Sequence, residues 1–476
     1  MPLIDPADRR PVHFVGIAGA GMSALAELFV RRGAVVTGCD ATGDATGDLG
    51  RLGISVATGH DPAHVAGARA LVVTSALPRD HPEVERARSL GIPVIRRAEA
   101  LAEAVSGGEL VAIAGTHGKT TTTVMTTEAL AAAGRDPTGV AGGRVGAWGG
   151  NLHPGGFAVQ VVEADEYDRS FLALTPTVAV VTNVEADHLD IYADLADIRA
   201  AFIQFIGPAR AIVVCADDAG ANSLPVPPSA EIVRYGTSSP DARLAARAIQ
   251  VTPYGAAFDV VYDGESLGPL ALRVPGLHNV RNALAAVGAG IAIGVTLDAM
   301  RPGLEGFTGV ERRFQRLGEV AGVTVIDDYA HHPTEIRATL DAARAAFPRR
   351  RIVAAFQPHL YSRTRDLATE FGAALATADV VLLTEIYPAR EQPIPGVTAG
   401  LIADAVTGSG RPLAWRGERS ALAAALAAAV RAGDVVLTLG AGDITRTGPE
   451  LLRTLGGGSA GDTGGLGSGL PRGQRA

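Results

Sequence analysis

The sequence predicts an α/β chain of three domains, each built around a mostly parallel sheet. Short β-branched runs alternate with alanine-rich helical stretches along almost the whole chain, which is the pattern of parallel strands joined by crossover helices. The length of 476 residues corresponds to roughly two to four domains. Glycine-rich or polar motifs follow several predicted strands, at the edge where open α/β sheets bind ligands.

The predicted strands each end close to a glycine, an acidic residue or a motif. They are 12–17, 34–39, 70–74, 110–114, 159–163, 178–182, 211–215, 351–356, 380–384 and 434–439. A glycine-rich break at 106–108 ends the first block, and the third block begins near Val310. We therefore expect domains at 1–108, 109–309 and 310–455, with a small antiparallel insertion within 216–270. A tail at 456–476, rich in Gly and Ser, is expected to be disordered.

Composition excludes several classes of protein. The chain is 47% hydrophobic and 19% charged, as in a globular protein, and its net charge of −8 argues against a nucleic-acid-binding surface. Its two cysteines, Cys39 and Cys215, are too few and too far apart to indicate a disulfide framework or a zinc site. The longest apolar run, 283–295, is shorter than the ~20 residues that span a bilayer. We expect a buried helix there, no membrane insertion and a cytoplasmic location.

A glycine loop after strand 110–114 carries the only lysine of the chain. Its residues are Gly115, Thr116, His117, Gly118, Lys119, Thr120 and Thr121. Glycines let backbone amides close on phosphate oxygens, and a helix N-terminus adds partial positive charge. Lys119 would reach the β- and γ-phosphates of a nucleotide, and the Thr120 hydroxyl would ligate Mg²⁺. Ile113 departs from the general phosphate-loop pattern, and a turn without a ligand is the alternative.

Polar residues also end the strands 159–163 and 178–182. The first is followed by an acidic run that starts at Glu163, and the second by a run that reaches His188. If both strands flank the lysine-loop strand, these groups meet at one sheet edge. Glu163 and Thr120 are the oxygen ligands that Mg²⁺ prefers, whereas imidazole is softer. Ordinary polar residues at strand ends are the alternative.

A second glycine turn, 16–24, follows the first predicted strand. Gly19, Gly21 and Ala24, with Asp40 at the end of the next strand, resemble a dinucleotide-binding fingerprint. The same geometry would bind any diphosphate, so an NAD enzyme and a UDP-sugar binder both fit. Tight strand-to-helix packing alone also favours glycine.

Two polar clusters, 327–335 and 356–365, follow strands in the third block. Basic and hydroxyl groups gathered there predict a site for a carboxylate-bearing substrate.

Together these motifs resemble the Mur ligases over nearly the whole chain, to about residue 455. The most specific segments are 115–121, 163–166, 182–190, 277–283, 327–333 and 356–359. The resemblance implies a Rossmann-like UDP-binding domain, a central P-loop ATPase domain and a C-terminal Rossmann-like domain. It also implies ATP-dependent joining of L-alanine to the lactyl carboxylate of UDP-N-acetylmuramate through an acyl phosphate, with two Mg²⁺ ions, in peptidoglycan precursor synthesis. The protein would be a monomer or homodimer.

The resemblance further implies roles residue by residue. The ATP contacts would be Gly115, Thr116, His117, Gly118, Lys119, Thr120, Thr121, Asn279, Asn282, Arg313 and Asp328. The metal ligands would be Thr120, Glu163 and His188, and the UDP-sugar contacts Gly19, Gly21, Met22, Ser23, Asp40 and Ser75. The contacts to the amino acid would be Tyr329, His331 and Arg363. Lys119 and His331 are the candidate catalytic residues, with His331 a candidate base.

Two positions depart from the family pattern. Phe202 stands near the place where sister ligases carry a carbamoylated lysine, which agrees with the alanine-adding branch. Leu360 stands where some alanine-adding members have arginine. Three alternatives stay open: a recycling ligase that attaches a whole tripeptide to the same UDP-sugar, an NAD-dependent oxidoreductase built on the first glycine turn, and a non-catalytic nucleotide sensor.

Overall fold

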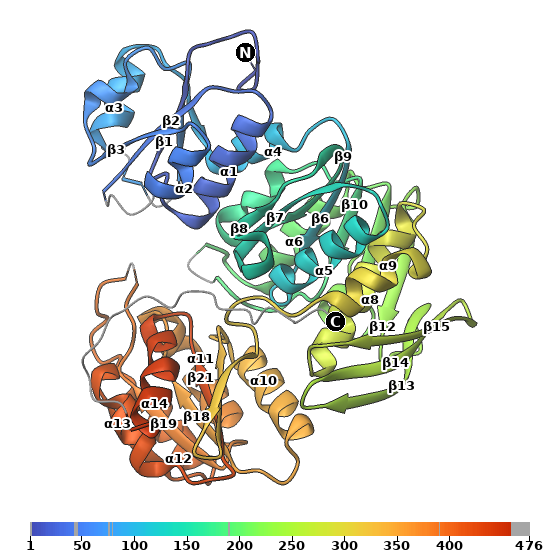
Figure 1. Cartoon of the computed structure of the whole chain (residues 1–476), viewed down its shortest axis with the longest axis vertical. Helices are drawn as coiled ribbons and strands as arrows, with labels where there is room; N and C mark the ends of the chain where they lie inside the picture. Colours follow the sequence, from blue (N-terminus) through green and yellow to red (C-terminus); the bar gives the residue numbers. More distant parts are fainter. Residues whose placement is uncertain are drawn as a thin grey trace, which may run out of the picture. The chain divides into compact units, whose positions relative to one another are not determined.

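The computed structural model of the chain describes residues 2–41, 46–74, 77–78, 80–188, 191–389 and 391–457. These residues form three sheets (Figure 1). The chain groups into two compact units, Met1–Gln315 with Ala338–Pro348 and Arg316–Arg337 with Arg349–Ala476. Ser75 and residues 458–476 lie outside the described residues. The predicted contact of Ser75 and nearly all of the predicted disordered tail therefore fall outside them as well.

The first sheet is formed by β1 (Val12–Val15), β2 (Val36–Asp40), β3 (Ser55–Thr58), β4 (Ala70–Val73) and β5 (Val94–Arg96). All its pairings are parallel, in the order β3-β2-β1-β4-β5. Its helices are α1 (Ala20–Arg31), α2 (Thr46–Arg51), α3 (Pro82–Ser89), α4 (Arg97–Ala104) and the 3₁₀ helix η2 (Pro62–Val65). The strand order reverses between β1 and β4, and such a switch point is where ligands bind to open sheets.

The second sheet has ten strands. They are β6 (Glu109–Ala114), β7 (Pro137–Val145), β8 (Gly150–His153), β9 (Gly156–Glu163), β10 (Val178–Val181), β11 (Ala211–Cys215), β12 (Glu231–Gly236), β13 (Leu244–Thr252), β14 (Gly255–Tyr262) and β15 (Glu265–Leu272). β6 pairs in parallel with β9 on one side and β10 on the other, which confirms the predicted neighbours of the lysine-loop strand.

The predicted antiparallel insertion is present as β13, β14 and β15. It begins later than we expected, because β12 lies inside the predicted segment and still pairs in parallel with β11.

Helices cover both faces of the second sheet. They are α5 (Lys119–Ala132), α6 (Leu195–Ile206), α7 (Ala219–Asn222), α8 (Leu277–Ala292), α9 (Leu297–Gly306) and the 3₁₀ helices η3 (Gly146–Trp148) and η4 (Tyr167–Ala173). Val111 and Ile113 of β6 share one core with α5, α8 and α9, whereas Ala112 and Ala114 join the core of α6. A strand covered on both faces needs such a continuous apolar run. α8 is buried along nearly its whole length, which confirms the predicted buried helix.

The third sheet has the order β16-β17-β21-β18-β19-β20. Its strands are β16 (Gln315–Val320), β17 (Val323–Asp328), β18 (Ile352–Phe356), β19 (Val380–Thr384), β20 (Leu413–Gly417) and β21 (Val435–Leu439). The helices are α10 (Pro333–Ala346), α11 (Tyr361–Leu375), α12 (Gly400–Gly408), α13 (Arg419–Ala429), α14 (Thr447–Leu455) and the 3₁₀ helix η5 (Asp443–Arg446). The five strands from β17 to β20 in this order pair in parallel, as expected for a Rossmann-like domain.

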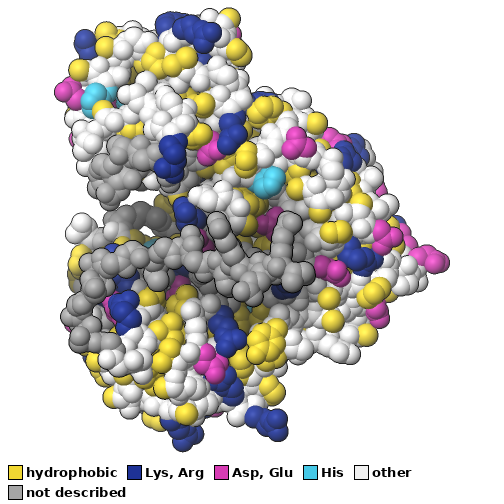
Figure 2. Space-filling view, in the orientation of Figure 1, with side chains coloured by type: hydrophobic (Ala, Val, Ile, Leu, Met, Phe, Trp, Pro, Cys, Tyr) yellow, Lys and Arg dark blue, Asp and Glu magenta, His cyan; other side chains and the backbone are white. Residues whose placement is uncertain are grey.

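The surface shows no basic stripe on the face that Figure 2 presents. Arginine side chains are scattered there among acidic and neutral groups. Of the helices in the described part of the chain, none has the length and apolar character needed to cross a membrane.

Candidate active site

The lysine loop leaves β6 at the sheet edge where β9 and β10 also end. Ile113 pairs with Glu163 of β9, and Ala114 pairs with Val181 of β10. The polar groups that follow the two flanking strands therefore lie on either side of the loop. This confirms that the acidic and histidine motifs meet the lysine loop at one edge.

The two glycines of the loop are required by its backbone. Gly115 has φ +138° and Gly118 has φ +81°, values that side-chain-bearing residues rarely adopt. A Cβ on Gly115 would lie 2.0 Å from Oγ1 of Thr182. The loop closes this tightly because Thr182 donates a hydrogen bond to the carbonyl of His117 at 2.6 Å. The side-chain oxygen of Asn183 accepts from the His117 amide at 2.7 Å.

Lys119 is held inside the site by carboxylate and carbonyl oxygens. Its ammonium donates to the carbonyl of Gly115 at 2.7 Å and to Oε2 of Glu166 at 2.7 Å. Burial disfavours the charge, but Glu166 and Asp165 outweigh it and raise the pKa of Lys119. The lysine is therefore a fixed positive charge at the N-terminus of α5. Glu166 belongs to the acidic run that follows β9, but nothing in the sequence spacing indicates that it pairs with Lys119.

Thr120 and Glu163 provide hard oxygen ligands next to the lysine. The Thr120 hydroxyl donates to Oε1 of Glu163 at 3.0 Å, and the Gly142 amide donates to its Oε2. Burial raises the pKa of Glu163, although Lys119 opposes the shift. A partly buried carboxylate beside a hydroxyl is a donor set that suits Mg²⁺, and the cation would offset the cost of withdrawing the carboxylate from water. The residues therefore fit the predicted metal.

His188 joins the same cluster through Glu166. Its Nε2 lies 3.8 Å from Oε1 of Glu166 and 3.8 Å from Oδ2 of Asp187. The residue has φ +53°, and its ring packs edge-on against Tyr167 with 5.2 Å between centroids. A strained backbone at a polar site is a common feature of functional positions.

Asn279 and Asn282 support the loop from α8. Oδ1 of Asn282 accepts a hydrogen bond from Thr122 at 3.2 Å, and Asn279 donates to the carbonyl of Pro275 at 2.7 Å. Both asparagines are buried. A Cβ on Gly118 would lie 2.8 Å from the same Oδ1 of Asn282, so the asparagine packs directly against the loop.

Arg313 belongs to the first compact unit, although we grouped it with the third block. It lies close enough to His278 of α8 for its charge to act on that ring. Burial, together with the charges of Arg281 and Arg313, lowers the pKa of His278 to about 4.

The N-terminal glycine turn has the geometry of a diphosphate site. Gly19 precedes α1, and its carbonyl accepts hydrogen bonds from the amides of Met22 and Ser23 at 2.9 Å each. Oδ2 of Asp40 accepts from the amide of Ala18 at 2.9 Å, which braces the turn from β2. The turn and the acid therefore meet as the fingerprint predicts.

A cavity of about 280 Å³ extends from this turn to Glu163. Gly21 and Met22 of the turn line it, as do Gly142 and Glu163 beside the lysine loop. Arg97 at the start of α4 also lines the cavity, and a Cβ on Gly21 would lie 3.3 Å from Nη1 of Arg97. Sequence reasoning missed Arg97 because it stands in no motif.

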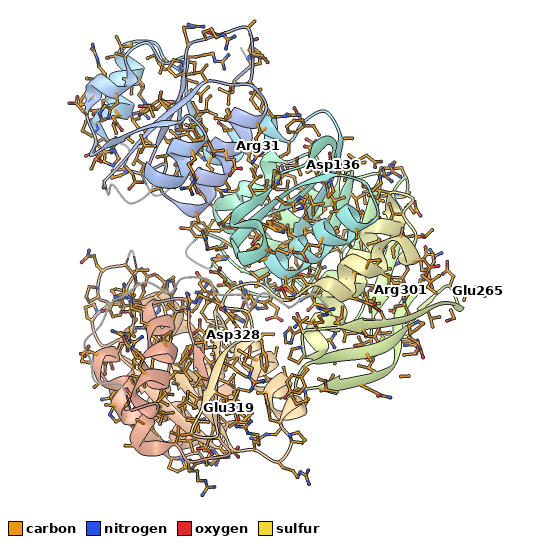
Figure 3. All side chains as sticks on the ribbon, viewed as in Figure 1. Arg31, Asp136, Glu265, Arg301, Glu319 and Asp328 are labelled. Carbon is orange, nitrogen blue, oxygen red and sulfur yellow. The ribbon has the colours of Figure 1, made fainter. Side chains whose placement is uncertain are left out.

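The polar residues predicted in the third block lie in the second compact unit. Asp328, labelled in Figure 3, ends β17 and accepts from the amide of Ala330 at 2.8 Å. Nδ1 of His331 lies 3.0 Å from the carbonyl oxygen of Tyr329 and 3.3 Å from Oε2 of Glu335. Because a carbonyl only accepts, Nδ1 donates the hydrogen bond to Tyr329.

Arg363 and Leu360 lie at the start of α11. Arg363 is buried in the first turn. Leu360 is also buried, with φ +71°, and its amide donates to the carbonyl of Tyr387 at 3.0 Å. The ring of Tyr387 stacks on His359 with 5.9 Å between centroids.

A glycine loop with lysine at a helix N-terminus, joined to a hydroxyl–carboxylate pair, defines a nucleoside-triphosphate-dependent enzyme of the α/β class. Sequence models of the Mur ligases match three consecutive parts of the chain. These are the "Mur ligase family, catalytic domain" at 11–108, the "Mur ligase middle domain" at 113–290 and the "Mur ligase, glutamate ligase domain" at 312–442. The chain belongs to the Mur ligase family.

Similar proteins agree in length as well as in sequence. UDP-N-acetylmuramate–L-alanine ligase of Salinibacter ruber is 46% identical over 452 residues, which cover 94% of this chain and 95% of that protein. The solved UDP-N-acetylmuramate–alanine ligase of Thermotoga maritima is 30% identical with a TM-score of 0.78, covering 94% and 99% of the two chains. A murein peptide ligase of Psychrobacter arcticus is 25% identical with a TM-score of 0.68, covering 94% and 99%.

Proposed function

We propose that this chain is the ATP-dependent ligase that joins L-alanine to the lactyl carboxylate of UDP-N-acetylmuramate, releasing ADP and phosphate, in peptidoglycan precursor synthesis. The observation that carries the proposal is the cavity between the N-terminal glycine turn and Glu163. A UDP-sugar held by its diphosphate at Gly21 and Met22 would point the rest of the molecule along this cavity. Its carboxylate would then end beside Lys119 and the metal ligands. Relatives of the same length that carry this name support the proposal.

The first step uses the lysine loop. A carboxylate is a poor electrophile, so ATP must first phosphorylate it. Lys119 and the amides of the loop hold the phosphates in line with the incoming carboxylate, which is most of what phosphoryl transfer requires of a protein. Thr120 and Glu163 would hold one Mg²⁺ and His188 a second, and bound Mg²⁺ neutralises charge that develops on the phosphates. Asn279 and Asn282 keep the loop in shape from α8.

The second step uses the second compact unit. The amine of L-alanine attacks the acyl carbon, and phosphate leaves as the amide forms. His331 is our candidate for the base that takes the ammonium proton, because imidazole is the side chain suited to proton transfer near neutral pH. Tyr329 and Glu335 hold its ring in place through Nδ1. Arg363 would bind the amino-acid carboxylate, with Tyr329 beside it. Asp328 of this unit and Arg313 of the first compact unit would contact the ribose and the phosphates of ATP.

A test of the base is the pH dependence of turnover. We expect His331→Asn to lower kcat about 10²–10⁴-fold near neutral pH. The deficit should shrink at higher pH, where L-alanine is already deprotonated in solution. An Asn variant with unchanged kcat at neutral pH would remove His331 from this role.

The organisation of the chain follows from the three sheets. We propose a UDP-sugar domain at 1–108, an ATP-binding domain at 109–309 and a C-terminal domain at 310–455. We also propose a cytoplasmic location, because the reaction consumes ATP and a nucleotide sugar, and a monomeric or homodimeric state.

Phosphate release tests the reaction directly. Purified protein with ATP, Mg²⁺ and UDP-N-acetylmuramate should release phosphate steadily only when L-alanine is added. L-Ala-γ-D-Glu-meso-diaminopimelate in its place tests the tripeptide-ligase alternative, which the likeness to a murein peptide ligase keeps relevant. Phosphate release that does not depend on L-alanine would overturn the proposal. Hydride transfer to NAD without ATP consumption would instead indicate an oxidoreductase.

A further inference from the structure

A cluster of histidine, cysteine and glutamate side chains lies in the first sheet's domain, apart from the active site. His13 stands on β1, Cys39 on β2, His64 on η2 and Glu83 on α3. One ligand-type atom from each of the four lies within 4.8 Å of all the others. Neither the glycine turn nor the lysine loop uses these groups, so the proposed reaction gives them no role.

The side chains are packed at the distances of a ligand set. Sγ of Cys39 lies 3.1 and 3.2 Å from the two carboxylate oxygens of Glu83, and Nδ1 of His64 lies 2.8 Å from Oε1 of Glu83. Four donors around one Zn²⁺ at bond lengths of about 2.0–2.3 Å stand roughly 3.3–3.8 Å apart. A small outward movement of Glu83 would bring its contacts with Cys39 and His64 to that spacing.

His13 gives an independent sign of a ligand. The residue is 2% exposed, and its Nε2 is buried with no hydrogen-bond partner. Nδ1 lies 2.9 Å from Oγ1 of Thr37. A neutral imidazole that donates its other N–H to a fixed acceptor is the usual arrangement of a metal-binding histidine.

Glu83 lacks a strong positive partner in the part of the chain described. Its side chain is fully buried, and the ion-pair contacts it makes there are to His60, His64 and His81. A buried carboxylate is costly without a paired charge. A divalent cation would supply that charge and satisfy Nε2 of His13 at the same time.

We propose that His13, Cys39, His64 and Glu83 bind a transition-metal ion of the zinc type. The site would be structural, because four protein ligands leave no open position. Two distant cysteines alone do not predict a zinc site. Only one of the four ligands is a cysteine, however, and the four come from four different elements. His60 and His81 stand next to the site on the Glu83 side, with 4.7 Å between their ring centroids.

The site is connected to the glycine turn through one peptide group. The carbonyl of Cys39 accepts hydrogen bonds from the amides of Gly16 and Ile17, at 2.8 and 3.1 Å. A metal on the Cys39 sulfur would therefore hold β2 and the turn in fixed register. We expect the ion to stabilise this domain and to take no part in catalysis.

Cobalt titration of the full-length protein tests the proposal. The protein is treated with a chelator and reductant and then titrated with Co²⁺. The expected result is one sulfur-to-cobalt charge-transfer band in the near ultraviolet, saturating at one ion per chain, with the visible bands of a tetrahedral centre. Co²⁺ at the Mg²⁺ positions has only oxygen and nitrogen ligands, so it cannot give the sulfur band. Zn²⁺ should abolish the band by displacement.

The two cysteines provide a matched pair of variants. Cys39→Ser should lose the charge-transfer band, whereas Cys215→Ser, which alters the other buried thiol of the chain, should keep it. His64→Ala should weaken Co²⁺ binding at least about tenfold, and Thr37→Val, which removes the partner of His13, about 10–100-fold.

Thermal unfolding gives a second readout that does not depend on colour. Stoichiometric Zn²⁺ should raise the Tm of the wild type and of Cys215→Ser, but not that of His64→Ala. The His64 side chain is 23% exposed, so the fold should tolerate this substitution. Absence of the sulfur band in the wild type, or a band that Cys39→Ser retains, would overturn the proposal. Neither result bears on the ligase reaction, which phosphate release measures separately.

Discussion

The ammonium of Lys119 lies 2.7 Å from Oε2 and 3.0 Å from Oε1 of Glu166, and both side chains are largely buried. The carboxylate therefore holds the lysine in the position from which it would reach the phosphates. Burial raises the pKa of Glu166, although Lys119 opposes the shift. The pair therefore fixes the position of the lysine charge, and the same Glu166 carboxylate also faces His188.

Lys119→Arg should abolish turnover and leave the fold intact. The guanidinium keeps a charge beside Glu166 but is too wide to sit between two phosphates as a point charge. We expect kcat to fall by at least about 10²–10³-fold, measured as L-alanine-dependent phosphate release.

Lys119→Met is the control for charge. It leaves the Glu166 carboxylate buried without its partner, which costs about 3–5 kcal/mol when a buried pair is broken. Urea unfolding should show the Met variant to be clearly less stable than the Arg variant. An Arg variant with wild-type turnover would contradict the role of the lysine.

Chemical labelling of side-chain amines reports on Lys119 alone, because it is the only lysine of the chain. The pKa of its ammonium is raised, and only neutral amines react with acylating reagents. We therefore expect intact-mass spectrometry to show at most two labels, with the N-terminus modified quickly and Lys119 slowly. ATP with Mg²⁺ should slow the labelling of Lys119 further. Rapid labelling of Lys119 at a rate that ATP does not change would contradict a contact between Lys119 and the phosphates.

Gly115→Ala should destroy the phosphate loop by a clash as well as by strain. The new Cβ would stand 2.0 Å from Oγ1 of Thr182 at φ +138°. Gly134 separates the two effects, because it has φ +75° with no atom within 4 Å of an added Cβ. We expect Gly134→Ala to cost about 1–2 kcal/mol with activity kept. Gly115→Ala should cost more and lose ATP-dependent turnover, as measured by unfolding and phosphate release.

The elements around this loop could be predicted because each depends on local sequence. The apolar run of β6 indicates a strand buried on both faces, and the glycines that follow it indicate a tight turn at a helix start. The pairing of Lys119 with Glu166 could not be predicted, since it depends on how the chain after β9 bends back. The same holds for the cluster around Glu83, whose members are brought together by four elements and share no sequence spacing. Arg97 illustrates the same limit, because only the folded α4 brings it beside Gly21.

Asp217 should make stability depend on pH in the acid range. Burial alone would raise its pKa, but hydrogen bonds from Thr237, Ser238 and Ser239 lower it below the usual value. A carboxylate whose folded pKa lies below the unfolded value of about 3.9 stabilises the fold above that pH, and the contribution is lost as pH falls through the folded pKa. We expect Asp217→Asn to cost about 1–3 kcal/mol at pH 7.

The difference between Asp217→Asn and the wild type should shrink in urea unfolding below about pH 4. Asp298→Asn is the control, because Asp298 pairs with Arg301 but its side chain is 86% exposed, and exposed pairs contribute little. A stability gap that stays constant with pH would contradict the assigned ionisation of Asp217.

Phe202 makes the proposed enzyme independent of lysine carbamoylation. Its ring is fully buried on α6 and packs edge-on against Phe171, with 5.2 Å between centroids. Phe171 in turn lines the cavity, so Phe202 supports its wall. A carbamate forms by attack of a neutral amine on CO₂, and the one lysine of the chain is held charged by Glu166. Turnover should therefore be the same in bicarbonate-free and bicarbonate-supplemented buffer.

Phe202→Lys should not restore a carbamoyl-lysine enzyme. The substitution removes a buried ring, which by itself costs about 3–5 kcal/mol, and it places an ammonium among aromatic side chains. We expect a lower Tm, a partly collapsed cavity and activity that bicarbonate does not rescue. Phe202→Leu retains an apolar side chain and should keep most of its turnover, as measured by phosphate release. Rescue of Phe202→Lys by bicarbonate would show instead that this position can supply a metal ligand, and that the cavity wall tolerates the loss of the ring.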